Sequence, residues 1–370
     1  MKSIHEIAEL ISNAGGRALV VGGVVRDRLL KLDSKDYDFE IYGLSLDDLE
    51  TTLKQLGPVQ TVGKSFGVLR VKGIDIDFSL PRKDNKTGSG HRGFTIEVDP
   101  TLSFTEAARR RDLTINSMGW DPLTDEILDP HCGQKDLASK TLKATDSTHF
   151  SEDPLRGLRV AQFAARFEMT PDPELISLCS QLDLSQLPAE RLLQEFRKML
   201  LKGTQPSIGI NFLKESKQLR FFPELEALIG APQNPKWHPE GDVWIHTLMS
   251  LDAAAKLRVG NTFEDEVLMF GVLCHDFGKP ETTQNIDGSF RCHGHEGAGV
   301  HFAKTFMNRL RASKELVAGV EAVVRNHLAP SQFPQQGAKP AAYRRLARKL
   351  EKANISLTLL ERASRADHWG

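Results

Sequence analysis

The chain has 370 residues, of which 40% are hydrophobic and 26% charged, and its formal net charge is −1. This length suits two or three domains, and the composition excludes a disordered, collagen-like or low-complexity protein. The near-zero charge excludes a uniformly basic nucleic-acid-binding protein but still permits a local basic groove. The most apolar run, residues 267–274, is too short for a membrane span. The N-terminus lacks the pattern of a signal peptide, so we expect a cytoplasmic protein without a membrane partner.

Residues 1–140 mix strand and helix patterns. Residues 18–21 form a β-rich run that ends at Gly22-Gly23, and residues 24–32 have helical spacing. Alternation at period two predicts further strands at 36–42, 68–71 and 74–80. These patterns predict an α+β head with a small mixed or antiparallel sheet.

The rest of the chain is predicted to be helical. Residues 141–228 have almost no strand signal, and apolar residues recur at helical spacing in 155–167, 174–182 and 189–201. A loop rich in proline, asparagine and tryptophan follows, and residues 229–370 again show helical patterns. We therefore expect a head (1–140), an all-α neck and body (141–228) and an all-α C-terminal domain (229–370). The four cysteines form no CxxC pair, so neither a zinc-thiolate site nor a disulfide framework is predicted.

Acidic residues alternate with other residues in two predicted strands of the head. Asp36 and Asp38 share one strand face because side chains at i and i+2 point the same way, and Asp75 and Asp77 form a second pair. Carboxylates placed together raise one another's pKa unless cations offset their charge. Two divalent ions are a common solution at sites where a phosphorus centre is attacked, and carboxylate oxygens suit Mg²⁺.

A short strand, two glycines and a helix start precede these carboxylates. This arrangement can form a phosphate cradle from backbone N–H groups, and Arg26 lies one turn into the helix. A tight turn without a ligand would have the same pattern. Together with Asp36 and Asp38, however, the turn favours a nucleotidyl-transfer site.

Several motifs occur in a fixed order over residues 15–200. They are V-G-G-V-V-R-D at 21–27, K-D-Y-D at 35–38, G-K-S-F-G at 63–67, Asp77, R-R-D-L-T-I-N at 110–116, E-D-P-L-R at 152–156 and Glu190-Arg191. This series resembles the class II tRNA nucleotidyltransferase and bacterial poly(A) polymerase family. Each motif is weak alone, and the resemblance depends on their joint order.

The resemblance implies a role for each part of the head. Asp36 and Asp38 would hold two Mg²⁺ ions, and Asp77 would orient or activate the 3′-hydroxyl of an RNA. That oxygen would attack the α-phosphate of an incoming nucleotide, and pyrophosphate would leave. The residues expected to bind the nucleotide are Gly22, Gly23, Arg26, Arg111, Asp112, Asn116, Asp153, Arg156 and Arg159.

Asp153 and Arg156 would choose the base. At i and i+3 of a helix they would face the same side, and a carboxylate with a guanidinium can imitate a complementary base edge. Cytosine and adenine both present an amine beside an acceptor, so the expected substrates are CTP, ATP and the tRNA 3′ end. A surface salt bridge is the structural alternative. The glycine-rich segment within residues 83–105 departs from the family pattern, so full CCA, CC-only, A-only and poly(A) addition all stay open.

A basic stripe lies near the C-terminus. Arg344, Arg345, Arg348 and Lys349 belong to a predicted helix with few acidic residues, so this helix is a candidate RNA-binding face. An ordinary solvated helix face would have the same pattern.

A second set of possible metal ligands lies in the C-terminal domain. In chain order they are His246, His275, Asp276, His295, His327 and Asp367. The order H…HD…D resembles the HD-domain phosphohydrolases, and His295 and His327 fit the extra ligands of a two-metal version. Such ligands suit Ni²⁺, Mn²⁺, iron or Zn²⁺ as well as Mg²⁺. Related tRNA enzymes usually continue past this domain, so whether an RNA-contacting tail is missing from this sequence stays open.

Three functional hypotheses follow. The first is a tRNA 3′-end nucleotidyltransferase whose HD domain could add a phosphohydrolase activity. The second is a poly(A) polymerase on the same scaffold. The third is an HD phosphohydrolase whose head only binds nucleotide or RNA, which the intact Asp36, Asp38 and Asp77 argue against. The oligomeric state is not predicted.

Overall fold

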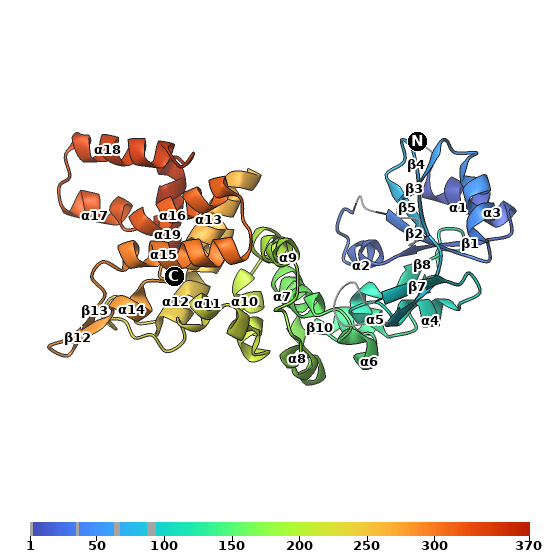
Figure 1. The fold of residues 1–370 in the computed structure, drawn as a ribbon, viewed down its shortest axis with the longest axis horizontal. Helices are drawn as coiled ribbons and strands as arrows, with labels where there is room; N and C mark the ends of the chain where they lie inside the picture. The colour runs from blue at the N-terminus through green and yellow to red at the C-terminus, as the bar shows by residue number, and fades with distance from the viewer. Residues whose placement is uncertain (1–2, 35–36, 63–66, 87–93) are drawn as a thin grey trace. The chain divides into compact units, whose positions relative to one another are not determined.

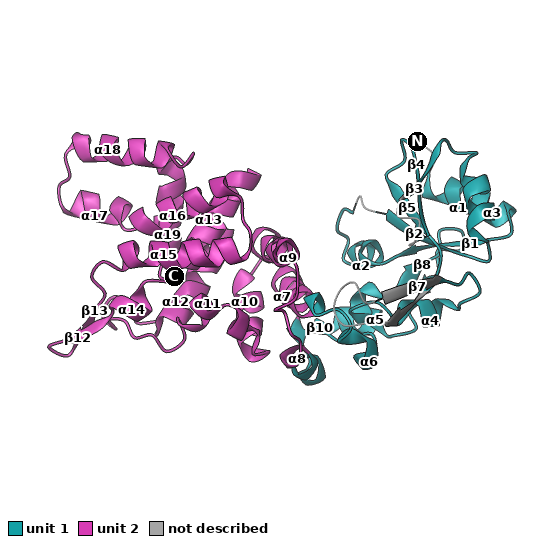
Figure 2. Ribbon diagram, viewed as in Figure 1, with its two compact units in different colours: residues 1–156, 170–178 teal, residues 157–169, 179–370 magenta. Residues whose placement is uncertain are grey.

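The chain, in a computed structural model that describes residues 3–34, 37–62, 67–86 and 94–370, forms two compact units. Residues 1–156 and 170–178 make the first unit, and residues 157–169 and 179–370 make the second (Figure 2). The first unit is α+β and the second is mainly helical (Figure 1), which confirms the predicted fold class. The predicted three-part division, with boundaries at 140 and 228, stays a prediction.

A seven-stranded mixed sheet forms the centre of the first unit. Its strand order is β3-β4-β5-β2-β1-β8-β9, in which β2 and β5 are parallel and the other neighbours antiparallel. The strands are β1 (Arg17–Val21), β2 (Tyr37–Tyr42), β3 (Val59–Val62), β4 (Val68–Val71), β5 (Ile76–Ser79), β8 (Gly119–Trp120) and β9 (Ile127–Leu128). Separate two-stranded pairs are β6 (Arg82–Lys86) with β7 (Phe94–Val98) and β10 (Thr141–Leu142) with β11 (Thr170–Pro171).

The two faces of this sheet differ in chemistry. Phe39 and Ile41 of β2 belong to the main apolar core together with α1 (Ile4–Asn13), α2 (Gly23–Leu29) and α3 (Leu46–Leu53). The alternate residues Asp38 and Glu40 point to the opposite face. There Leu19 and Val21 pack with α4 (Phe104–Ala108) in a smaller cluster. Strand β2 therefore presents its acidic residues beside α4.

Short helical elements complete the first unit. They are η1 (Thr114–Asn116), α5 (Gly133–Ala138) and α6 (Ser147–Phe150).

The second unit is built from helices and one small hairpin. Its elements are α7 (Leu155–Phe167), α8 (Pro173–Ser180), α9 (Ala189–Lys202), α10 (Pro206–Glu215), η2 (Gln218–Phe221), α11 (Pro223–Glu226), α12 (Val243–Ala255), α13 (Thr262–Cys274), α14 (Lys279–Thr282), β12 (Gln284–Ile286), β13 (Ser289–Arg291), α15 (His295–Arg309), α16 (Lys314–Asn326), α17 (Ala329–Gln335), α18 (Pro340–Glu351) and α19 (Leu357–Trp369). Helices α7 and α8 each begin in the first unit and end in the second. Within the described part of the chain, no helix is sufficiently long and apolar to span a membrane.

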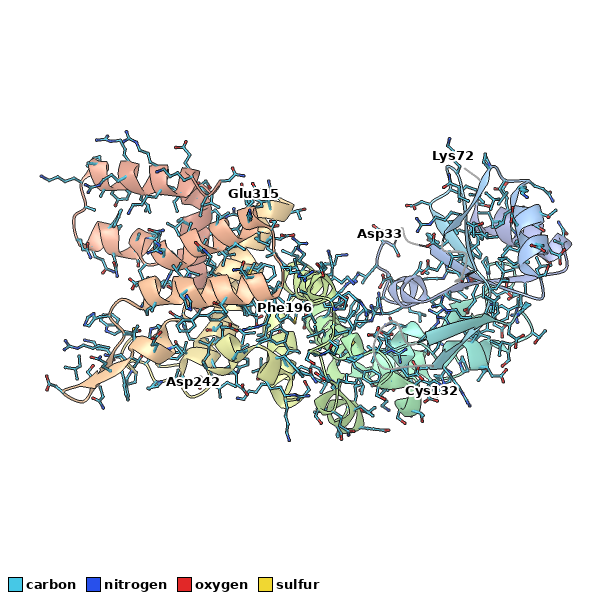
Figure 3. All side chains as sticks on the ribbon, in the orientation of Figure 1. Asp33, Lys72, Cys132, Phe196, Asp242 and Glu315 are labelled. Carbon is cyan, nitrogen blue, oxygen red and sulfur yellow. The ribbon has the colours of Figure 1, made fainter. Side chains whose placement is uncertain are left out.

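Helix α13 is the central element of the second unit. All its residues from Asp265 to Cys274 are buried, and it packs on α12, α16 and α19. Phe196, labelled in Figure 3, meets Phe222 and Phe306 at ring-centroid distances of 5.0 and 5.7 Å in the same core. The residues that follow α13 therefore start inside the protein.

The predicted elements agree well with the structure. The predicted strand at 68–71 and helix at 155–167 have the observed bounds, and the other elements differ by a few residues at their ends. Strands β3, β6, β7, β8 and β9 of the first unit, the short β10–β11 pair and the hairpin of β12 and β13 were not predicted. Two- or three-residue strands have too few alternating residues to produce a period-two signal.

We predict that Gly278→Ala destabilises the second unit. A Cβ at this position would lie 2.1 Å from the carbonyl oxygen of His295 and 2.6 Å from the nitrogen of Gly299, so the turn or α15 must shift. Such overpacking costs about 1–3 kcal/mol. Thermal unfolding followed by circular dichroism measures it. The matched control is Gly297→Ala in α15, where nothing lies within 4 Å and alanine should be neutral or stabilising by up to about 1 kcal/mol. Equal melting temperatures for both variants would contradict this account.

Candidate active sites in the head and the HD region

Asp38 and Asp77 lie side by side on the sheet. They are register partners on the parallel strands β2 and β5, so both side chains point to the same face. Neighbouring strands are about 4.8 Å apart. Asp36 lies outside the described residues. The structure thus brings together the two described members of the predicted carboxylate group.

Arg70 holds the Asp77 carboxylate. The two residues are register partners on β4 and β5, and the guanidinium donates to both carboxylate oxygens, with Nη2 2.8 Å from Oδ2. Asp77, Asp75 and Asp38 together raise the pKa of Arg70. The sequence analysis missed this residue, although the period-two alternation of β4 already places Arg70 on an exposed face. Arg70 is therefore a local counter-charge for the acidic strands.

The glycine turn leads into α2 as expected. Gly22 has φ +83°, a left-handed conformation that favours glycine, and Gly23 begins the helix. Arg26 is only 3% exposed, and its guanidinium donates to Asp27 Oδ1 at 2.9 Å and to Asn116 Oδ1 at 2.5 Å. In this structure Arg26 joins α2 to η1, so its predicted contact with a phosphate stays a prediction.

The R-R-D motif is placed beside the glycine turn. Asn116 Nδ2 donates to Asp112 Oδ1 at 3.1 Å, and both residues are buried. A Cβ on Gly22 would lie 3.1 Å from Arg111 Nη1, so the arginine lies directly against the turn. Burial lowers the pKa of Arg111. The structure therefore brings together six of the predicted nucleotide-binding residues: Gly22, Gly23, Arg26, Arg111, Asp112 and Asn116.

The predicted shared helix face of Asp153 and Arg156 is wrong. Helix α7 begins only at Leu155, and Asp153 lies before it, where its Oδ1 accepts from the backbone N–H of Leu155 at 3.1 Å. Pro154 explains the difference because it disfavours helical geometry for the residue before it. Arg156 donates to the carbonyl oxygens of His149 and Arg110 at 2.7 and 2.6 Å.

Arg159 lies in the part of α7 that belongs to the second unit. Its guanidinium carbon is 5.2 Å from the centroid of the Phe163 ring. The roles of Asp153, Arg156 and Arg159 stay predictions.

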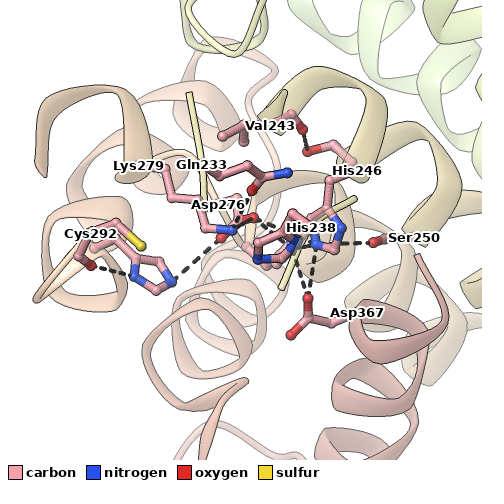
Figure 4. Close-up of polar contacts among 12 residues, drawn as sticks. Gln233, His238, Val243, His246, Ser250, Asp276, Lys279, Cys292 and Asp367 are labelled. Atoms are coloured by element: carbon pink, nitrogen blue, oxygen red, sulfur yellow. Dashed lines mark hydrogen bonds and ion pairs between the residues drawn. The ribbon is translucent and has the colours of Figure 1, made fainter. Parts of the chain in front are cut away.

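The six predicted metal ligands of the second unit lie together. They come from five places in the chain: His246 on α12, His275 and Asp276 after α13, His295 at the start of α15, His327 after α16 and Asp367 on α19. The buried carboxylate of Asp276 lies between two histidine pairs, with Oδ2 3.2 Å from His275 Nε2 and Oδ1 3.5 Å from His295 Nε2. Asp367 Oδ1 is 3.0 Å from His246 Nε2 (Figure 4).

The imidazole orientations fit cation binding. The Nδ1 atoms of His275, His295 and His327 lie 2.7–2.9 Å from backbone carbonyl oxygens, which directs each Nε2 inward. There Nε2 of His246 is 3.3 Å from that of His275, and Nε2 of His295 is 3.4 Å from that of His327. Facing lone pairs repel unless a proton or metal ion lies between them. Among the described residues, buried Asp276 Oδ1 has no hydrogen-bond donor. These donors therefore fit two adjacent metal ions.

Charges and burial within this cluster shift the pKa values of its members. Burial opposes protonation of His275, but Asp276 and Asp367 outweigh it and raise the pKa to about 10. Burial would raise the pKa values of Asp276 and Asp367, but the neighbouring cations and hydrogen bonds hold both well below their usual range. Burial lowers the pKa of His327 to about 4.

Three supporting residues were missed in the sequence. Glu240 Oε1 lies 3.0 Å from His246 Nδ1 and fixes that ring. Lys279 Nζ lies 2.7 Å from Asp276 Oδ2 and donates to Gln233 Oε1 at 2.9 Å. Lys279 could have been found from the sequence because it follows the His-Asp pair by only a few residues. Nothing in the sequence around Gln233 indicates its contact with Lys279. The ligands open into a pocket of about 770 Å³, whose lining includes Lys279 and Trp237, and Trp237 is 72% exposed.

The predicted RNA-binding residues lie on α18. All four, Arg344, Arg345, Arg348 and Lys349, are exposed. The helix buries only Leu346 and Leu350. An RNA-binding face and an ordinary solvated helix face would both be exposed in this way. RNA binding at α18 therefore stays a prediction.

Two family matches agree with this geometry. Residues 18–143 match the Poly A polymerase head domain, and residues 243–367 match the HD domain. Together with the fold, they define the class of protein: a nucleotidyltransferase whose head is combined with an HD domain. Both families use divalent metal ions, and groups of side chains able to hold such ions are present in the second unit.

The chain belongs to the multifunctional CCA protein family. It is 40% identical over 304 residues to the multifunctional CCA protein of Psychromonas ingrahamii, a match that covers 80% of this chain and 71% of that protein. The corresponding protein of Neisseria meningitidis serogroup A is 39% identical over 321 residues, covering 85% and 73%. The fold is similar to that of the Thermotoga maritima CCA-adding enzyme complexed with tRNA, with a TM-score of 0.62, 17% identity, and coverage of 99% of this chain and 77% of that one.

We predict that Mn²⁺ stabilises the second unit through its histidine cluster. A ligand at 100 times its Kd stabilises a native protein by about 2.7 kcal/mol. Differential scanning calorimetry should therefore show a higher melting temperature with Mn²⁺ than with a chelator. His327→Ala should abolish most of this increase, because it removes one ligand of the His295 pair. The control His368→Ala changes an exposed histidine on α19 and should keep the full increase. An equal metal-induced shift in both variants would mean that the cluster does not bind the ion.

Proposed function

We propose that the protein adds C and A nucleotides to the tRNA 3′ end without a nucleic-acid template, with CTP and ATP as substrates. Membership of the multifunctional CCA protein family supports this function. The structural observation in its favour is the pairing of Asp38 and Asp77 on neighbouring parallel strands. The glycine turn and Arg111 lie in the same unit. We also propose that the protein acts in the cytoplasm.

The head residues divide the work of nucleotidyl transfer. The N–H group of Gly23 and the Arg111 guanidinium bind the triphosphate, while the Gly22 N–H donates to the Met118 carbonyl oxygen at 3.3 Å. Asp77 orients the RNA 3′-hydroxyl, whose oxygen attacks the α-phosphate and displaces pyrophosphate. Positioning and charge neutralisation account for most of the acceleration in phosphoryl chemistry. Two Mg²⁺ ions held by Asp36 and Asp38 would supply the positive charge that offsets the phosphates and carboxylates.

Base selection would be performed by the residues that connect the head to α7. Arg156 presents donors and Asp153 acceptors, which together match the amine-and-acceptor edge shared by cytosine and adenine. In this structure their atoms bond to protein backbone groups. Binding of the base would therefore exchange these backbone bonds for bonds to the nucleotide.

The set of nucleotides added is the open part of this proposal. Full CCA addition has the support of the family, while CC-only, A-only and poly(A) addition use the same metal-binding carboxylates. Residues 87–93, in the departing glycine-rich segment, lie outside the described residues. Sequencing the products of a reaction with tRNA lacking CCA and all four nucleotides distinguishes these activities. Long A tails on generic RNA, with no use of CTP, would favour the poly(A) polymerase.

The HD region supports a second function, hydrolysis of a phosphoester. The supporting observation is that a histidine pair lies on either side of Asp276, which lines an open pocket together with His295 and His327. Ni²⁺, Mn²⁺, Mg²⁺ or iron at these ligands would supply an activated water. The chain's own contribution is to hold four imidazoles and two carboxylates in place through backbone carbonyls, Glu240 and Lys279.

We predict that Asp38→Asn and His275→Ala separate the two activities. Asp38→Asn should lower the rate of nucleotide addition about 10²- to 10³-fold. The variant loses a carboxylate charge that would hold Mg²⁺ beside the reacting phosphate. It should leave any phosphohydrolase activity unchanged. His275→Ala should have the reverse effect, measured by primer extension of tRNA and by phosphate release from phosphoesters.

Asp75→Asn is the matched control for the first variant. Asp75 is an exposed carboxylate two residues from Asp77, outside the paired positions of β2 and β5. Its substitution should change extension less than twofold. If the unmodified protein adds no nucleotide while its phosphohydrolase activity persists, the head would be only a binding module.

We predict that Arg156→Ala relaxes base choice. A bidentate side-chain contact to a base discriminates by about 1–3 kcal/mol, which corresponds to about ten- to hundredfold. The ratio of kcat/KM for CTP to that for UTP should fall by this factor. Arg109→Ala, at an exposed arginine in the same unit, should leave the ratio unchanged. An unaltered ratio in Arg156→Ala would exclude this residue from base recognition, whatever happens to the overall rate.

A further inference from the structure

A fully buried carboxylate lies beneath the candidate nucleotide site. Glu40 is 0% exposed and follows Asp38 by two residues on β2, so the two side chains share a face of the sheet. Neither the proposed chemistry nor any of the motifs assigns it a role. A buried carboxylate that lacks compensation is strongly destabilising, so its neighbours explain why it is present.

Glu40 is compensated by the two arginines that follow α4. Its Oε1 accepts from Arg110 Nη2 at 2.9 Å, and its Oε2 lies 3.7 Å from Arg111 Nη2. The Tyr42 hydroxyl also donates to Oε2 at 2.9 Å. Burial would raise the pKa of Glu40, but the two guanidiniums and these hydrogen bonds hold it below its ordinary value. Glu40 is therefore charged and holds two like charges together.

The two arginines are bound to Glu40 unequally. Arg110 makes a short hydrogen bond, whereas the 3.7 Å separation for Arg111 is too long for one. Within the part of the chain that the structure describes, the buried Nε of Arg111 has no hydrogen-bond partner either. A guanidinium has five N–H donors. Arg111 is thus held by charge, and the part of its guanidinium that is exposed can donate to a ligand.

The position of Arg111 indicates which ligand this is. The Nη1 atom of Arg111 lies 3.1 Å from the position that a Cβ on Gly22 would take. Arg111 therefore lies beside the Gly22-Gly23 turn, which leads into α2. An anion with several oxygens can bind the guanidinium and the turn together. The triphosphate of a nucleotide has this chemistry, and this assignment depends on the proposed nucleotidyl transfer.

We propose that Glu40 is a positioning residue, which holds Arg111 against the glycine turn as a preformed receptor for the triphosphate of the incoming nucleotide. Glu40 itself touches neither the nucleotide nor the RNA. It also anchors Arg110, whose carbonyl oxygen accepts from Arg156 Nη2 at 2.6 Å. One buried carboxylate therefore supports both the triphosphate receptor and the residue proposed to choose the base.

Two opposite effects of removing the charge must be compared. Glu40→Gln removes a negative charge near a bound anion, which by itself would strengthen triphosphate binding. It also leaves two partly buried guanidiniums that repel each other without a counter-charge, which displaces Arg111. The proposal requires the second effect to dominate, because an uncompensated buried charge costs more than a screened repulsion gains.

The first experiment measures binding of inorganic tripolyphosphate to the full chain by isothermal titration calorimetry in chelator. Glu40→Gln should weaken binding about ten- to hundredfold, the range typical of residues that orient a binding group. The same substitution in an Arg111→Ala background should cause no further loss, which separates the head from any anion binding in the second unit. Unchanged or tighter binding in Glu40→Gln, or full additivity of the two substitutions, would overturn the proposal.

The second experiment measures kinetic constants of tRNA extension with CTP. A positioning role predicts a KM about tenfold higher, with a smaller change in kcat. A purely structural role would lower the folded fraction and therefore kcat at constant KM, and that result would overturn the proposal. Tyr42→Phe is the control, since it removes a hydrogen bond to the same carboxylate but keeps its charge, and KM should change less than twofold.

The two experiments can distinguish an error in the role of Glu40 from an error in the proposed function. If the unmodified protein does not extend tRNA, nucleotidyl transfer is refuted, whereas the tripolyphosphate titration still decides whether Glu40 positions Arg111. Glu40→Asp, which keeps the charge on a shorter side chain, should restore part of the tripolyphosphate affinity lost in Glu40→Gln. No recovery of affinity in a folded Glu40→Asp variant would count against a role for the charge.

Discussion

Both candidate sites obey one electrostatic constraint: buried groups of like charge, or facing lone pairs, stay together only when an opposite charge lies among them. In the head, Arg70 faces Asp77, and Glu40 lies below Arg110 and Arg111. In the second unit, the buried Asp276 carboxylate lies among imidazoles, with Lys279 at 2.7 Å. The neighbours of each charge hold it in place before any ligand arrives, so little rearrangement is needed on binding.

Strand β2 links several functions of the head. Its alternating residues contribute Asp38 to the carboxylate pair and Glu40 to the arginine cluster, while Phe39 and Ile41 on the other face anchor the strand in the main core. The covering helix α4 ends directly before the arginines that Glu40 binds. A single strand, rigidly packed on one side, can therefore set the positions of carboxylates and phosphate-binding groups on its other side. Support by regular elements is more precise than support by loops.

Sequence reasoning was most reliable where the signal was periodic. Period-two alternation found the strands with Asp38 and Asp77, and the six candidate HD ligands, chosen by motif order, lie together in the structure. The helical prediction for Asp153 failed because Pro154 keeps the residue before it out of the helix, which begins at Leu155. Spacing also could not show that the fold buries Arg26 against Asp27 and Asn116, and its predicted contact with a phosphate stays a prediction. Such errors arise because spacing describes one element at a time.

From the order of its residues alone, the chain could be assigned an α+β head, a helical remainder and two sets of candidate ligands, since hydrophobic period and motif order are local properties of the sequence. Only the folded chain could show that Glu40 binds arginines 70 residues away, that Arg70 pairs with Asp77, and that Glu240 and Lys279 support the histidine cluster. These pairs depend on strand register and on which helix covers which face, and both are decided by packing across the whole unit.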